Sequence, residues 1–217
     1  IRLRNNNDRI MDEIEYNDRA PWPVGADGSG ASLSKIDPRT KGTRGGEWAD
    51  SVEIGGTPGV VNFRGAPASL SLNEVAGDTA APGDYFIEIF NAGGADVELG
   101  GCLITSQSGQ EHVIADGVIA PHGGQVTIFE ADLGFRVADN DNLYFYTPAR
   151  DTLLDALRAD DAGRARYPDG GKQLLVTGSG IAATPGALNA ALPPSAVVIN
   201  EIMYHHAVTD GEDWIEL

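Results

Sequence analysis

Hydrophobic and polar residues alternate with a period of two through the middle of the chain. Residues 70–75 alternate in this way, and Phe86, Glu88 and Phe90 share one face of the next segment. Successive side chains of a strand point to opposite faces of a sheet, so both segments predict β-strands. Similar segments follow at residues 97–99, 102–104, 113–114, 125–129, 142–146 and 173–176.

Glycine- and proline-rich breaks separate these segments, as at residues 121–124 and 168–171. Residues 152–159 form the one stretch that is ambiguous between helix and strand. Short strands at intervals of roughly 8–12 residues, within about 120 residues in all, predict an all-β sandwich. The positions expected to face its core are Leu72, Val75, Ile87, Ile89, Leu99, Leu103, Ile128, Phe145 and Leu175.

Two motifs recur in the sequence at one spacing. Residues 57–62 (TPGVVN) return as 184–189 (TPGALN), and residues 73–75 (NEV) return as 200–202 (NEI), both at a displacement of 127. Residues 84–89 also match 212–217, one position out of step. A period this long is typical of tandem domains rather than of a solenoid.

A looser match extends the repeat. Residues 1–14 align with 144–157 at a displacement of 143, and the difference, 143 − 127 = 16, is the length of an insertion expected between positions 36 and 55. We therefore predict three units: residues 1–63 as the C-terminal part of a first domain, 68–190 as a complete domain, and 197–217 as the first strands of a third copy. Short proline-bearing linkers are expected at 63–67 and 190–195.

The ordered motifs of the complete unit resemble the lamin tail domain family in its bacterial extracellular form. They are residues 73–75 (NEV), 86–91 (FIEIFN), 97–101 (VELGG), 119–123 (IAPHG) and 183–186 (ATPG). The resemblance implies an immunoglobulin-like β-sandwich without catalytic machinery. It also implies an accessory module of a large secreted or cell-surface bacterial protein, serving as a spacer, an adhesion unit or a docking unit for a protein or cell-surface partner.

Composition and charge narrow the functional classes. The net charge is −17, and so acidic a chain repels a phosphate backbone, which argues against nucleic-acid binding. No apolar run reaches the roughly 18 residues of a membrane span. A single cysteine excludes an internal disulfide framework and a thiolate zinc site.

Carboxylates in the repeated motifs suggest calcium as the one candidate metal. Glu74 and Glu88 lie on neighbouring predicted strands, with Asp84 close by in sequence, and Asp139 and Asp141 form the densest group of oxygen ligands. The alternative is that the glutamates pair with arginine or accept hydrogen bonds, and that Asp139 and Asp141 belong to a turn. No Asp-x-Asp-x-Asp-Gly loop supports the metal interpretation, and no cofactor is expected.

Other candidate sites have simpler alternatives. Tyr144 and Tyr146 share a strand face that suits sugar stacking, although packing explains it equally. His205, His206 and Asp210 suggest a metal site, but adjacent strand residues point to opposite faces. The acidic run 155–161 is expected to be a solvated connection. Hydrolysis by surface carboxylates stays a third class of function, because no particular pair stands out.

The C-terminal segment Ile199–Leu217 suggests a route to self-association. Strands of an incomplete domain expose unpaired backbone groups and apolar side chains. We expect residues 199–204 or 214–217 to add to a sheet edge, either in residues 1–62 of the same chain or in a neighbouring copy, which would give a strand-swapped homo-oligomer.

Overall fold

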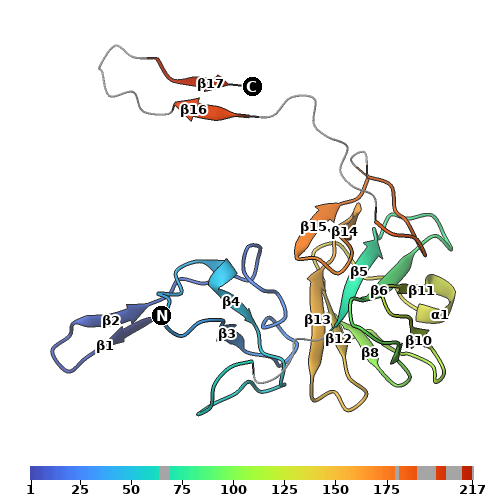
Figure 1. Cartoon of the computed structure of the whole chain (residues 1–217), viewed down its shortest axis with the longest axis horizontal. Coiled ribbons are helices and arrows are strands. Elements are labelled where there is room, and N and C mark those ends of the chain that lie inside the picture. Colours follow the sequence, from blue (N-terminus) through green and yellow to red (C-terminus); the bar gives the residue numbers. More distant parts are fainter. Residues whose placement is uncertain (64–68, 179–180, 190–198, 204–211, 217) are drawn as a thin grey trace.

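The computed structural model describes residues 1–63, 69–178, 181–189, 199–203 and 212–216 (Figure 1). It confirms an almost entirely β chain with an immunoglobulin-like sandwich at its centre. Most of the two expected linkers, and His205, His206 and Asp210, lie outside the described residues.

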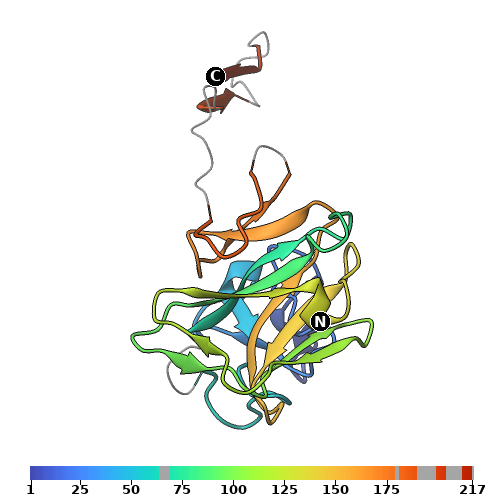
Figure 2. The ribbon, with the colours of Figure 1, turned by 90° about the vertical axis from the view of Figure 1, so that its right-hand side faces the viewer.

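Two antiparallel sheets form the sandwich (Figure 2). One has the order β11-β6-β5-β14-β15 and the other the order β13-β12-β8-β9. The first sheet contains β5 (Leu70–Ala76), β6 (Phe86–Asn91), β11 (Gln125–Phe129), β14 (Gly163–Tyr167) and β15 (Gln173–Val176). The second contains β8 (Leu103–Ser106), β9 (Glu111–Val113), β12 (Asn142–Tyr146) and β13 (Leu153–Arg158).

Smaller elements complete the sandwich. The strands β7 (Val97–Glu98) and β10 (Ile119–Ala120) pair with each other, and α1 (Glu130–Leu133) is a single helical turn after β11. The ambiguous stretch at 152–159 is strand β13, not helix. Its residues form an antiparallel ladder with the neighbouring strand β12.

The core lies between the two sheets and contains the expected residues, with two exceptions, Leu103 and Leu175. Leu103 was expected to face inward, but it is only half-buried and lies on the outer face of β8. Its partner across the ladder is Tyr146, whereas Ile104 pairs with the inward-facing Phe145. Residues directly opposite in an antiparallel pair share a face, so Ile104 takes the core position.

Leu175 is buried but lies outside the core. It shares the outer face of its sheet with Ala165 and Glu74, because the three residues are directly opposite one another along the ladders. Its neighbour Leu174 packs against the core instead.

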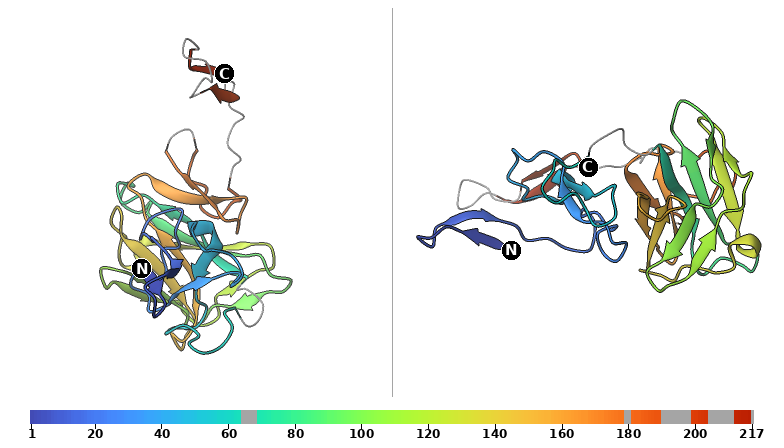
Figure 3. Two further views of the ribbon diagram at one scale, coloured as in Figure 1. Left: turned by 90° about the vertical axis from the view of Figure 1, so that its left-hand side faces the viewer. Right: turned by 90° about the horizontal axis from the view of Figure 1, so that it is seen from below.

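The N-terminal segment packs on one flank of the sandwich (Figure 3). It consists of β1 (Arg2–Arg4), β2 (Ile10–Glu13), β3 (Leu33–Lys35), the 3-10 turn η1 (Gly45–Glu47) and β4 (Trp48–Asp50). Residues 25–31 cover the outer face of β12, where the Tyr146 hydroxyl donates to the Ser29 carbonyl over 3.0 Å and the Tyr144 hydroxyl to that of Asp27. Tyr144 and Tyr146 are therefore buried, which corrects the suggestion of an exposed sugar platform.

Backbone pairing adds to this interface. The Leu153 N–H donates to the Val52 carbonyl over 2.8 Å, and the Ile54 N–H donates to the Asp151 carbonyl over 2.9 Å. Residues 52–54 therefore run beside the start of β13, which is the edge strand of its sheet. This pairing satisfies backbone groups that an edge strand would otherwise leave open.

The pairing of the N-terminal hairpin resembles that of β12–β13. Leu3 lies opposite Asp12 and a bulge follows, just as Phe145 lies opposite Asp155 and a bulge follows. The side chains of Asn62 and Asn189 donate to the carbonyls of Lys35 and Arg166, so the displacement at β3 is 166 − 35 = 131 and no longer 143. On this alignment most of the insertion precedes β3, whereas it was expected between positions 36 and 55, and it includes the segment that covers β12.

The C-terminal strands form a separate hairpin (Figure 1). β16 (Glu201–Met203) pairs with β17 (Trp214–Glu216), and among the described residues this is its only ladder. The expected addition of this segment to the N-terminal strands of its own chain is therefore absent from the described residues. Addition to a neighbouring copy stays a prediction.

Candidate functional site

Two buried glutamates lie side by side at the centre of the five-stranded sheet. Glu74 of β5 is directly opposite Glu88 of β6 in the ladder, and neither residue is exposed. Like charges in directly opposite positions destabilise a strand pair, and a buried carboxylate needs hydrogen-bond donors. The sheet can hold this pair only because donors come from elsewhere in the chain.

The repeated segment at residues 184–189 supplies these donors. The backbone N–H of Thr184 donates to both carboxylate oxygens of Glu74, over 3.0 and 3.1 Å, and the Thr184 hydroxyl donates to Oε2 over 3.0 Å. The backbone N–H of Gly186 donates to Oε2 of Glu88 over 2.8 Å. Gly186 has φ +75°, a conformation that glycine adopts without strain.

Three further side chains complete the network. Asn73 and Thr127 each donate to Glu88 over 3.0 Å, from the strands on either side of β6. Asn189 donates to the carbonyl of Arg166 over 2.9 Å and accepts from the Thr184 hydroxyl over 2.8 Å. The loop at residues 184–189 is thus fixed at both ends, and it covers the outer face of the five-stranded sheet. We call these residues, Asn73, Glu74, Glu88, Thr127, Thr184, Gly186 and Asn189, the carboxylate network.

Burial, with a smaller contribution from the charges of Glu88 and Asp169, raises the pKa of Glu74 to about 7. The hydrogen bonds from Thr184 act in the opposite direction. Desolvation is the larger effect because the side chain has no contact with solvent. A group that titrates near neutral pH in this place makes the attachment of the loop sensitive to pH.

An ion pair links the two sheets beside the network. Arg166 donates to both carboxylate oxygens of Asp155, over 3.0 and 2.9 Å, and its Nε donates to the Leu72 carbonyl over 2.8 Å. Asp155 also accepts from the Leu72 N–H over 2.7 Å. Asp155 is thus largely buried, and the expectation that the run 155–161 is a solvated connection is wrong over residues 155–158, which belong to β13.

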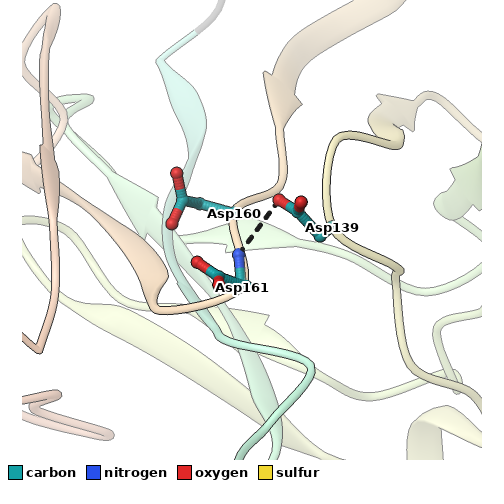
Figure 4. A group of neighbouring side chains, drawn as sticks. All are labelled: Asp139, Asp160 and Asp161. Carbon is teal, nitrogen blue, oxygen red and sulfur yellow. Dashed lines mark hydrogen bonds between the residues drawn. The ribbon is translucent and has the colours of Figure 1, made fainter.

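The other calcium candidates lie apart from the two glutamates. Asp84 is exposed in the turn before β6, and Asp141 accepts from the Ser108 hydroxyl over 2.6 Å. Asp139 lies beside Asp160 and Asp161, with one oxygen of each within 4.8 Å of the others (Figure 4).

Neighbouring protein groups also contact this acidic group. Asp139 accepts from the Asp161 backbone N–H over 3.2 Å, and Asp160 pairs with Arg164 over 2.8 Å. The hydrogen bond with Asp160 and then burial raise the pKa of Asp161. Calcium binding by Glu74, Asp84, Glu88, Asp139 or Asp141 stays a prediction.

One comparison with known proteins bears on this arrangement. Residues 64–165 match the family model of the Lamin Tail Domain. No curated protein and no solved structure matches the sequence. The matched range contains both glutamates of the carboxylate network but ends before the loop that binds them.

The lamin tail domain is an immunoglobulin-like module, so the match agrees with the sandwich. β15 and the loop at 184–189 lie beyond the matched residues, yet they complete the five-stranded sheet and cover it. Among the described residues, no helix is long and apolar enough to cross a membrane.

The two glutamates could be found from the sequence, but their hydrogen-bond partners could not. The donor in both cases is a backbone N–H in a distant part of the chain, and a backbone group leaves no mark in the sequence. The signal that could have found the loop was the repeat itself, because the Thr-Pro-Gly and Asn-Glu motifs recur at the same displacement. Motifs that recur together belong to one structural unit.

Proposed function

We propose that the chain is a non-catalytic module of a secreted or cell-surface bacterial protein with several domains, acting as a spacer and docking unit. The observation that carries the proposal is the interface between the N-terminal segment and the sandwich. Hydrogen bonds at Leu153 and Ile54, together with buried Tyr144 and Tyr146, join the two parts. A spacer needs such a joint, because unattached domains separated by a short linker move independently.

The family match supports a binding role over a catalytic one, since the lamin tail domain is a protein-interaction module. An acidic surface suits a partner that is basic or that carries bound cations. Secretion and attachment to a bacterial surface belong to the proposal.

Backbone NMR relaxation of the full chain tests the joint. We expect residues 25–54 and 69–178 to share one rotational correlation time. A Tyr146→Ala variant should weaken the coupling between them, and a Tyr16→Ala variant, which changes an exposed tyrosine, should not. Two independent correlation times in the unaltered chain would contradict a rigid spacer.

The alternative is a calcium- or carbohydrate-binding accessory domain. The group formed by Asp139, Asp160 and Asp161 is the feature that favours calcium. Calorimetric titration with calcium should then give a saturable response that Asp139→Asn abolishes and Asp84→Asn leaves unchanged. A titration without heat of binding would contradict calcium binding. Binding to a glycan array tests the carbohydrate alternative in the same way.

A further inference from the structure

A groove runs beside β3 in the N-terminal segment. It has a volume of about 350 Å³ and lies between β3, Trp48 and the first copy of the Thr-Pro-Gly loop. Among the described residues, β3 pairs with β4 on one side only. The residues that line the groove are Ser32, Leu33, Ser34, Lys35, Trp48, Gly55, Gly56, Thr57, Pro58 and Asn62.

The groove has an occupied counterpart in the sandwich. The Thr57 hydroxyl donates to Asn62 over 2.9 Å and Asn62 donates to the Lys35 carbonyl over 3.0 Å. Thr184, Asn189 and Arg166 repeat these contacts at 2.8 and 2.9 Å. β3 thus corresponds to β14, and the loop at 57–62 corresponds to the loop at 184–189.

Strand β5 fills the corresponding place in the sandwich. It pairs with β14, with Val75 opposite Arg164 and Glu74 opposite Ala165. Glu74 and Glu88 then accept the backbone N–H groups of Thr184 and Gly186. The equivalent N–H groups of Thr57 and Gly59 donate to no acceptor among the described residues.

The C-terminal hairpin reproduces the part of the sandwich that fills this place. Glu201 lies opposite Glu216 and Ile202 opposite Ile215, as Glu74 lies opposite Glu88 and Val75 opposite Ile87. Asn200 donates to Glu216 over 2.5 Å, as Asn73 donates to Glu88 over 3.0 Å. The hairpin therefore has the register and the carboxylates of the two strands that fill the equivalent place in the sandwich.

We infer that the groove beside β3 binds the β16–β17 hairpin of a second copy of the chain. β16 adds to β3 with Ile202 opposite Leu33 and Glu201 opposite Ser34. Glu201 then accepts from the Thr57 N–H, and Glu216 accepts from the Gly59 N–H. The inference rests on the docking role proposed above and names the partner and the surface.

Charge and exposure both favour this occupant. Residues 197–217 contain five acidic residues and no lysine or arginine, whereas the groove contains Lys35, whose ammonium lies over the Trp48 ring, 5.9 Å from its centroid. Ile202 and Ile215 are 54% and 60% exposed in the hairpin. In their own chain the hydrogen bonds of residues 199–203 and 212–216 all stay within the hairpin among the described residues.

A disulfide between two chains tests the register. Cα atoms of directly opposite residues in an antiparallel pair are about 4.5–5.5 Å apart, within disulfide reach. We expect a full chain with Leu33→Cys to crosslink under mild oxidation to one with Ile202→Cys. Ile119→Cys is the matched control, because Ile119 is 53% exposed, and it should not crosslink. The native Cys102 is buried and does not compete.

Sedimentation of the full chain tests the carboxylates. Glu201→Ala and Glu216→Ala should each raise the dimer dissociation constant about tenfold, since each removes a hydrogen bond to a charged group. Glu212→Ala, in the same hairpin and also exposed, should leave it unchanged.

Three outcomes overturn the inference. They are a monomeric full chain at about 0.1 mM, a crosslink that is equally efficient with Ile119→Cys, and, in a chain that carries both Leu33→Cys and Ile202→Cys, a disulfide that closes within that chain. A monomer whose N-terminal segment and sandwich still tumble together would refute the inference alone and leave the spacer function standing.

Discussion

The hairpins β5–β6 and β16–β17 have the same pairing but opposite environments. Val75 and Ile87 are almost completely buried in the sandwich, whereas their counterparts Ile202 and Ile215 are exposed. Both hairpins also have the asparagine-to-glutamate hydrogen bond. The local sequence is therefore sufficient to define the hairpin and its register, and burial depends on the strands and the loop that dock against it.

The largest expected difference concerns apolar packing. Ile87→Ala should lower the free energy of unfolding of the sandwich by about 4 kcal/mol, because it leaves a cavity in the core. Ile215→Ala should change it by less than about 0.5 kcal/mol, since that side chain is exposed. Urea unfolding of the two variants at a concentration where the chain is monomeric measures both values, and equal losses would show that β16–β17 packs against the core of its own chain.

The carboxylate network gives the second test. Glu88→Ala should lower the free energy of unfolding of the sandwich by about 3 kcal/mol. Asn73, Thr127 and Gly186 then lose their hydrogen-bond acceptor inside the protein. Glu216→Ala should have almost no effect on the unfolding of the sandwich. A small loss for Glu88→Ala in thermal or urea unfolding would mean that water replaces the carboxylate.

The pH dependence of the free energy of unfolding gives the third test. Glu74 has a pKa of about 7 in the folded chain against 4.5 for an unperturbed glutamate, so between these values the folded state binds more protons. Stability should therefore fall as pH rises from 4.5 to 7, by up to roughly 3 kcal/mol.

Glu74→Gln isolates this contribution. The variant cannot lose a proton, so its unfolding free energy should change less over the same pH range than that of the unaltered chain. Glu201→Gln, the change at the exposed counterpart, should leave the pH profile unchanged. Parallel profiles for the unaltered chain and Glu74→Gln would rule out titration of Glu74 in this range.

The smallest effect is expected at the joint with the N-terminal segment. Tyr146→Phe removes the hydrogen bond to the Ser29 carbonyl and should weaken the attachment of the N-terminal segment to the sandwich by about 1 kcal/mol. Tyr16→Phe, at an exposed tyrosine, is the control. The rate of amide hydrogen exchange at residues 25–31 should rise in Tyr146→Phe. An unchanged rate would mean that the other contacts of the interface are sufficient to hold the segment.

The sequence predicted what depends on neighbours in the chain. Alternation identified both faces of β6, and the repeat identified the two hairpins that share one register. Alternation was misleading at Leu103, where the strand begins shortly after a turn and the core residue is the next one, Ile104.

The rest of the fold depends on contacts between distant segments. Sugar stacking was considered for Tyr144 and Tyr146 because the residues that cover them precede them by 117 positions. Glu88 was considered as a calcium ligand or a hydrogen-bond acceptor, but its donor Gly186 could not be identified because it follows by 98 positions. Asp139 lies beside Asp160 and Asp161 because two loops meet, and no spacing within either loop indicates this.

The separation between the glutamates and their donors has a consequence for synthesis on the ribosome. Thr184 and Gly186 are translated 110 and 98 residues after the glutamates they bind. Until they emerge, β5 and β6 hold two opposed carboxylates without these backbone donors. We therefore expect the nascent sandwich to stay open until residues 184–189 leave the exit tunnel, so its folding finishes only after the whole of it has been translated.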